Sequence, residues 1–157
     1  MKKLFLVTYL LFSSFTLPAS AHCEIPCGIY DDKARFQEML EHSETIKKSM
    51  QEIAKIKQVK QIDYHALTRW TINKEEHATK IQKIIAQYFL TQRIKIPAAE
   101  ASKQDQQNYN TQLALAQQIL VKAMKTKQVT NLDSVNNLRA ALEKYQQYYF
   151  KQHGHKH

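Results

Sequence analysis

Nine consecutive residues near the N-terminus carry the side chains best suited to metal chemistry. They read HCEIPCGIY over residues 22–30 and include both cysteines of the chain. With His22 as the first residue of a mature chain, its α-amine and imidazole, the backbone nitrogen of Cys23 and the thiolates of Cys23 and Cys27 can surround one metal ion. Nitrogen and sulfur donors in a planar array favour Ni(II) or Cu(II), whereas Zn(II) prefers a tetrahedron. The alternative is a disulfide between the two cysteines, which is natural in an exported protein.

A metal site of this kind requires a free amine at His22, and the preceding residues predict how that amine arises. Residues 1–21 contain the three parts of a secretory signal peptide: a basic start, an apolar stretch over residues 4–12, and an A-x-A cleavage site at residues 19–21. The apolar stretch is too short to span a bilayer and ends at Pro18, which argues against a membrane anchor. We therefore expect cleavage before His22 and export to a periplasm or to the medium.

The positive charge of the chain is compatible with a polyanionic partner or with attraction of a small anion. Lys and Arg number 23 against 14 Asp and Glu, for a net charge of +9, and loss of the two lysines within residues 1–21 leaves 9 − 2 = +7. The basic residues are spread along the chain without a dense run or an aromatic-and-basic motif. This distribution is typical of a solvated helix surface, so we expect no nucleic-acid partner, and no membrane partner after cleavage.

The elements that must position residues 22–30 are helices. No glycine and a single proline, Pro97, occur between residues 29 and 153, and this scarcity excludes a β-sandwich, a β-barrel and a Gly-rich phosphate loop. Apolar residues recur instead at helical spacing in four segments. The first segment begins at a capping residue, Asp31 or Asp32, and runs to about Val59, and the second begins at Asp63 and runs to about Ile94. The third follows the 97–104 connection and continues through Met124, and the fourth begins at Thr130 or Asn131 and ends at Gln152.

These segments predict an all-α, antiparallel four-helix bundle over residues 31–152, preceded by the irregular metal-binding segment 22–30 and followed by a His-rich tail over residues 153–157. No glutamate is followed three residues later by histidine, and no C-x-x-C-H motif occurs, so the bundle lacks the signatures of a di-iron or haem site. The predicted core face comprises Phe36, Leu40, Ile46, Met50, Ile53, Ile56, Leu67, Trp70, Ile81, Ile84, Ile85, Tyr88, Tyr109, Leu113, Ala116, Leu120, Met124, Leu132, Val135, Leu138, Leu142, Tyr145 and Tyr149.

The N-terminal pattern resembles a known family. HCEIPCGIY is similar at every specified position to H-C-x-x-P-C-G-x-Y, the nickel hook at the mature N-terminus of the nickel-containing superoxide dismutases. Two further stretches, NKEEHA over residues 73–78 and QYFLTQRIK over residues 87–95, resemble the second helix of that family. The resemblance implies an oxidoreductase that converts superoxide to oxygen and hydrogen peroxide, with one nickel ion per chain and a homohexameric assembly.

The resemblance also implies roles for the hook residues, 22–30. His22 would supply amine and imidazole, Cys23 its amide nitrogen and thiolate, and Cys27 the second thiolate, to a centre that alternates between Ni(II) and Ni(III). Tyr30 resembles the residue that limits access to the metal. Its alternative role is aromatic packing where the hook meets the first helix.

Further supporting residues are implied within the bundle. Tyr88 resembles a second tyrosine that approaches the metal from a helix, although a plain core or interface role fits as well. His77 stands where relatives place a basic side chain that positions the hook histidine, and it is a weaker, pH-dependent donor than arginine. The acidic partner expected in the first helix is Gln37 or Glu38, depending on a one-residue gap.

Two other readings of the sequence stay open. One is an exported helical module that binds or senses a metal without turnover, and the other is a structural bundle closed by a disulfide. His42 and His65 are predicted as helix-surface residues. The tail HGHKH either binds nickel or copper loosely, which would help loading, or is a frayed end.

Overall fold

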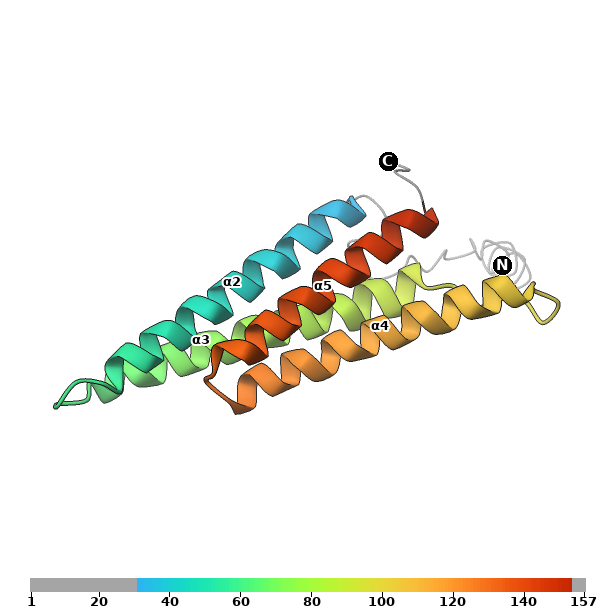
Figure 1. Cartoon of the computed structure of the whole chain (residues 1–157). Coiled ribbons are helices and arrows are strands. Elements are labelled where there is room, and N and C mark those ends of the chain that lie inside the picture. The colour runs from blue at the N-terminus through green and yellow to red at the C-terminus, as the bar shows by residue number, and fades with distance from the viewer. Residues whose placement is uncertain (1–30, 154–157) are drawn as a thin grey trace, which may run out of the picture.

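The computed structural model describes residues 31–153 and shows an all-helical protein (Figure 1). Four long α-helices follow one another, and a π-helical stretch continues the second of them. In chain order the elements are α2 (Asp32–Ile56), α3 (Tyr64–Lys83), η1 (Ile84–Arg93), α4 (Lys103–Gln128) and α5 (Leu132–His153). No strand occurs in this described part of the chain. The predicted four-helix bundle is confirmed.

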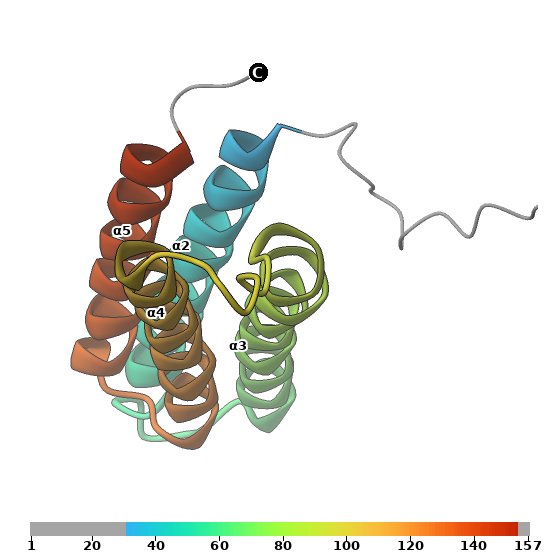
Figure 2. The ribbon, with the colours of Figure 1, turned by 90° about the vertical axis from the view of Figure 1, so that its right-hand side faces the viewer.

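The four helices lie lengthwise beside one another (Figure 2). Helix α2 packs against α3 and α5, and α4 packs against the same two helices. Successive helices run in opposite directions because the connections between them, residues 57–63, 94–102 and 129–131, are short. The start of α2 and the end of α5 therefore lie side by side at one end of the bundle, the end at which α3 continues into η1 (Figures 1 and 2).

Each α-helix begins after a side chain that satisfies a backbone N–H of the first turn. Such caps supply one of the hydrogen bonds that a helix start otherwise lacks, and each stabilises the helix by about 1 kcal/mol. The sequence predicted the second cap and offered two candidates each for the first and the fourth, one of which is correct in each case. It missed the third cap, which lies in the connection after Pro97. The four capping residues are Asp31, Asp63, Ser102 and Asn131.

The core is richest in aromatic rings at the end of the bundle where α2 begins. The ring of Phe36 lies 4.7 Å from that of Phe89, 5.4 Å from Tyr145 and 5.6 Å from Tyr149, measured between centroids. Tilted and edge-on aromatic pairs of this kind each contribute about 1 kcal/mol beyond the burial of their surface. Because Phe36 lies one turn after Asp32, this cluster fixes the first turn of α2 against η1 and α5.

Two predicted core residues are exposed. Met124 is 42% exposed because the buried side of α4 is offset by about one residue from the predicted face, and Leu132 is 38% exposed because it is the first residue of α5. The residues that α4 does bury are Gln112, Leu115, Ala116, Ile119, Ala123 and Thr126. The helical period alone located the helix but not the rotation of its buried face.

The second predicted helix changes its winding near its end. From Ile84 to Arg93 the backbone is π-helical, and the N–H of Ile94 bonds to the carbonyl of Phe89, five residues back, at 2.9 Å. A π-helical turn brings side chains five residues apart onto the same side, whereas an α-helix aligns those three or four apart. The sequence predicted a continuous α-helix here, since a π-helix leaves no periodic signal of its own over so short a stretch.

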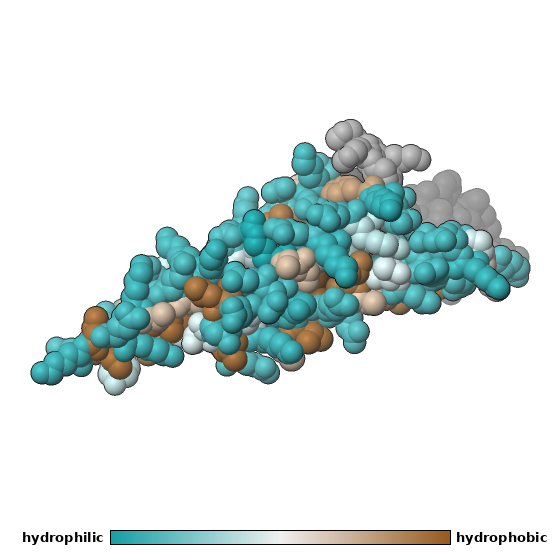
Figure 3. Space-filling model, viewed as in Figure 1, coloured by the Kyte–Doolittle hydropathy of each residue, from teal (hydrophilic) through white to brown (hydrophobic). Residues whose placement is uncertain are grey.

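The face of the molecule seen in Figure 3 is mainly hydrophilic, with apolar residues in small separate groups. The larger exposed apolar side chains include Tyr64 and Ile72 on α3 and Ile96 in the connection that follows η1. No helix among the described residues is both long enough and apolar enough to cross a membrane.

Candidate functional site

The proposed metal ligands, and the tyrosine proposed to limit access to the metal, precede the part of the chain that the structure describes. His22, Cys23, Cys27 and Tyr30 all lie outside residues 31–153. What the structure shows is the frame to which these residues are attached, beginning with Asp31, the cap of α2. Two sites on this frame concern the residues that the sequence singled out.

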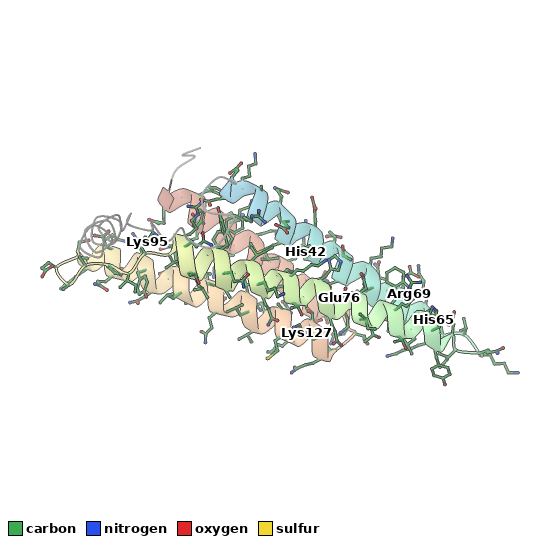
Figure 4. The ribbon with its side chains drawn as sticks, turned by 180° about the vertical axis from the view of Figure 1, so that it is seen from behind. His42, His65, Arg69, Glu76, Lys95 and Lys127 are labelled. Atoms are coloured by element: carbon green, nitrogen blue, oxygen red, sulfur yellow. The ribbon has the colours of Figure 1, made fainter. Side chains whose placement is uncertain are left out.

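The first site is a pair of histidines between α2 and α3. The Nδ1 atoms of His77 and His42 lie 3.1 Å apart, and the two rings meet edge-on with centroids 4.8 Å apart. Figure 4 shows His42 where α2 borders α3. The expectation that His42 is a helix-surface residue is wrong: its side chain is only 14% exposed, because the pairing of α2 with α3 places it against His77.

Both rings favour the neutral form. Burial, followed by the proximity of His77 and Lys80, lowers the pKa of His42, although the nearby carboxylates of Glu38 and Glu41 oppose the change. Burial and Lys80 likewise lower the pKa of His77, against the opposing effect of Glu76. A neutral ring carries one N–H and one lone pair, so the two rings can share a hydrogen bond between their Nδ1 atoms.

The acidic residue beside this pair is Glu38. Its Oε1 lies 3.8 Å from Nε2 of His42, and its Oε2 accepts a 2.5 Å hydrogen bond from Arg35. Gln37, the other candidate, is exposed. Of the two residues left open by the sequence, only Glu38 faces the histidines.

One buried atom of the pair has a vacant hydrogen-bonding position. Nε2 of His42 is buried and has no hydrogen-bond partner among residues 31–153, since 3.8 Å to Glu38 is too long for a hydrogen bond. Buried polar atoms in folded proteins are nearly always satisfied. A water molecule or another polar group from outside the described residues would satisfy this atom.

The second site surrounds Tyr88, which lies in the π-helical stretch and is 3% exposed. Its hydroxyl donates a 2.5 Å hydrogen bond to Oδ1 of Asp32 and accepts one of 2.6 Å from Arg93. Burial, together with the bond to Asp32, raises the pKa of Tyr88, so the phenol keeps its proton at neutral pH. The residue implied as a second active-site tyrosine is thus held against Asp32 in the first turn of α2, and Asp32 follows Tyr30 by two positions in the sequence.

The spacing of residues in the sequence contains a signal for both contacts. In a pair of antiparallel helices, residues equally distant from the middle of the connection face each other. Residues 42 and 77 are centred on (42 + 77)/2 = 59.5, and residues 32 and 88 on (32 + 88)/2 = 60, within the 57–63 connection. Folding the two predicted helices about that point would have paired His42 with His77 and Asp32 with Tyr88.

The remaining histidines of the bundle form no such cluster. His65 is exposed on α3, as predicted (Figure 4). Of the His-rich tail, residues 153–157, the first residue, His153, is the last residue of α5. Residues 154–157 lie outside the described part. Within the described residues, no group of three or more His, Cys, Asp or Glu side chains is arranged to hold a metal ion.

Comparison with known proteins gives one match. The sequence model of a family described as nickel-containing superoxide dismutase matches residues 17–153, a range that includes residues 22–30 and all four helices. No curated protein and no solved structure matches the chain.

Proposed function

The chain belongs to the nickel-containing superoxide dismutase family, and on that premise we propose that residues 22–30 form its nickel centre. Members of the family are oxidoreductases that act on superoxide with nickel as cofactor, and this chain is one of them. The observation that carries the proposal is the position of HCEIPCGIY: it lies inside the matched range and directly precedes the cap of α2.

The donors of this segment suit nickel. His22 would contribute its amine and imidazole, Cys23 its amide nitrogen and thiolate, and Cys27 a second thiolate; such strong donors favour the higher oxidation state. When bound, nickel supplies a centre that alternates between Ni(III) and Ni(II), so that one superoxide is oxidised to oxygen and the next is reduced to hydrogen peroxide. The free amine of His22 requires removal of residues 1–21, and we propose that this occurs during export.

The histidine pair lies within reach of the hook. Residues 22–30 extended end to end span about 30 Å, and α2 rises only about 15 Å between Asp32 and His42. The vacant position at Nε2 of His42, and the second ring nitrogen of His77, are the groups that an imidazole at His22 can use. We propose that His77, backed by His42, holds the His22 ring in its orientation.

This arrangement replaces a single, permanently charged hydrogen-bond donor with two histidine rings whose protons can change position. Where the family resemblance implies a basic side chain, the chain places a neutral ring whose tautomer depends on the hydrogen bond that it makes to its partner. Glu38 stands beside His42 and favours a proton on the Nε2 that faces it. The pair can therefore donate to, or accept from, the hook without a net charge of its own.

The remaining proposals concern access and assembly. Tyr30 would limit which molecules reach the metal, and the +7 charge of a mature chain would draw superoxide towards it. A homohexamer is supported by the family resemblance. Sedimentation analysis of mature protein measures that assembly directly.

The decisive experiment compares two N-termini. Mature protein that begins at His22 and the same protein with one extra alanine in front are loaded with nickel, and superoxide consumption is measured by pulse radiolysis. Rapid turnover by the His22 form alone would support both the ligand set and the role of cleavage. Nickel binding without turnover in either form would favour the metal-binding or sensing module, and turnover in both would show that the amine is not a ligand.

A further inference from the structure

We propose that Asp32, held by Tyr88, Arg93 and Tyr149, is a positioning residue that anchors the C-terminal end of the hook to the bundle. This inference rests on the proposed function, because it assigns the anchored segment to the nickel centre. The four residues come from three elements, α2, η1 and α5, and meet at the end of the bundle where residues 22–30 join it (Figure 1). We refer to these four side chains as the Asp32 clamp.

Both oxygens of the Asp32 carboxylate are occupied. Oδ1 accepts the Tyr88 hydroxyl at 2.5 Å and pairs with Nε of Arg93 at 2.8 Å, and Oδ2 accepts the Tyr149 hydroxyl at 2.8 Å. Arg93 also donates to the Tyr88 oxygen and lies 4.8 Å from the centroid of the Tyr88 ring. Hydrogen bonds to a carboxylate are among the stronger ones in proteins, and here the two tyrosine hydroxyls tie Asp32 to sequence positions 56 and 117 residues away.

The π-helical winding is what assembles the clamp. Tyr88 and Arg93 are five residues apart, and their side chains meet because one turn of η1 spans that spacing. In an α-helix these two residues would point about 140° apart, and Arg93 would leave the carboxylate. π-Helical turns are rare, and they are frequently found at functional sites.

The clamp is a second attachment of the start of α2 to the rest of the bundle. The aromatic core already fixes the first turn of α2 through Phe36. Asp32 adds a second attachment at the first helical residue, two positions after Tyr30 and five after Cys27. Rigid attachment there restricts where the hook can place its last ligand and its gating tyrosine, and small displacements of such groups are costly for a reaction centre.

The test compares two adjacent substitutions that change the charge equally. Asp32→Asn weakens the clamp, whereas Asp31→Asn keeps the helix cap, because asparagine caps as well as aspartate does. In mature, nickel-loaded protein, the rate of nickel transfer to EDTA is measured together with hydrogen exchange over residues 22–31. We expect Asp32→Asn to release nickel about tenfold faster, the size of effect typical of residues that support metal ligands, and Asp31→Asn to match the wild type.

A second variant covers the case in which Asp32→Asn does not fold. Tyr149→Phe removes one hydrogen bond to Oδ2 without a change of charge, and we expect faster nickel release by a factor of about three, with an unchanged circular dichroism spectrum. Lowered thermal stability with wild-type nickel release and wild-type hydrogen exchange in the folded variants would overturn the proposal, because the cluster would then serve the bundle alone.

The proposed function is tested separately in the same series. Cys27→Ser should abolish tight nickel binding, and if it does not, the hook is not the nickel site and the proposed function fails. Hydrogen exchange over residues 22–31 in nickel-free protein still tests the clamp in that event. Faster exchange in Asp32→Asn than in Asp31→Asn supports the anchor, and equal exchange refutes it.

Discussion

His42 and His77 place their Nδ1 atoms 3.1 Å apart across the interface between α2 and α3. A hydrogen bond between two such nitrogens needs an N–H on one and a lone pair on the other, so at least one ring must be neutral. Burial lowers the pKa of each ring below its ordinary value of 6.5, which keeps this condition satisfied at neutral pH. The contact therefore depends on pH in a direction that can be measured.

Replacement of both histidines should weaken the dependence of stability on pH. In the unfolded chain they take up protons near pH 6.5, but in the folded protein only at lower pH, so the unfolded state binds more protons within that window. The free energy of unfolding of the wild type should consequently fall as the pH drops from 7.5 to 5.5. In His42→Gln/His77→Gln the fall should be smaller by roughly 1–2 kcal/mol, measured by urea denaturation at both pH values.

The matched control for that prediction is His65→Gln, which removes an exposed histidine from α3. It should leave the pH dependence of the wild type unchanged. A double variant with the same pH dependence as the wild type would show that the pair titrates like free histidine.

Lys74 caps the end of α4 from inside the bundle. It is 2% exposed, and its ammonium group donates to the carbonyls of Thr126 and Lys127 at 2.7 and 2.6 Å. Lys74→Met keeps the aliphatic stem but leaves these carbonyls without their partner and removes a cation from the negative end of the helix dipole. We expect a loss of about 2–4 kcal/mol in the free energy of unfolding, measured in guanidinium chloride.

Lys125→Met provides the comparison, because Lys125 lies in the last turn of the same helix but is exposed. Its substitution should change stability by less than about 0.5 kcal/mol. Equal effects of the two substitutions would mean that the buried hydrogen bonds of Lys74 contribute nothing beyond its charge.

Removal of the Tyr88 hydroxyl should destabilise the fold more than removal of the partly buried Tyr148 hydroxyl. Tyr88→Phe deletes a donor to Asp32 and an acceptor for Arg93, for an expected cost of about 1–3 kcal/mol. Tyr148→Phe deletes a single partly buried bond to Asn108 and should cost about 1 kcal/mol or less. Thermal unfolding of the two variants gives the comparison, and a Tyr88→Phe variant as stable as the wild type would contradict it.

Nickel removal in air should trap the hook in an oxidised form. Once nickel is stripped by a chelator, the thiolates of Cys23 and Cys27 are free to close the disulfide that the sequence alone equally permits. Activity should then return on addition of nickel only after treatment with a thiol reductant. Removal and reloading without oxygen should need no reductant, and recovery in air without one would show that this disulfide does not form.

The local parts of this protein were predictable from sequence. The scarcity of glycine and proline and the helical recurrence of apolar residues indicated four helices. Asp63 marked the start of one of them, and two others were located to within one residue, at Asp31 or Asp32 and at Thr130 or Asn131. These features act within one turn or one helix, so neighbouring residues are sufficient to specify them. The hook pattern is local as well, and nine consecutive residues identified the family and its metal.

The sequence allowed these supporting contacts, and the tertiary structure decided which of them formed. His42 meets His77, and Asp32 meets Tyr88 and Tyr149, because α2 packs against both α3 and α5 in one register. Arg93 joins the clamp because the backbone of η1 winds as a π-helix, which no local propensity predicts. Helical periodicity fixes which residues share a face of one helix, but the rotation and sliding of that face against its neighbours follow from the packing of all four helices together. That packing selected which polar groups of the sequence became partners.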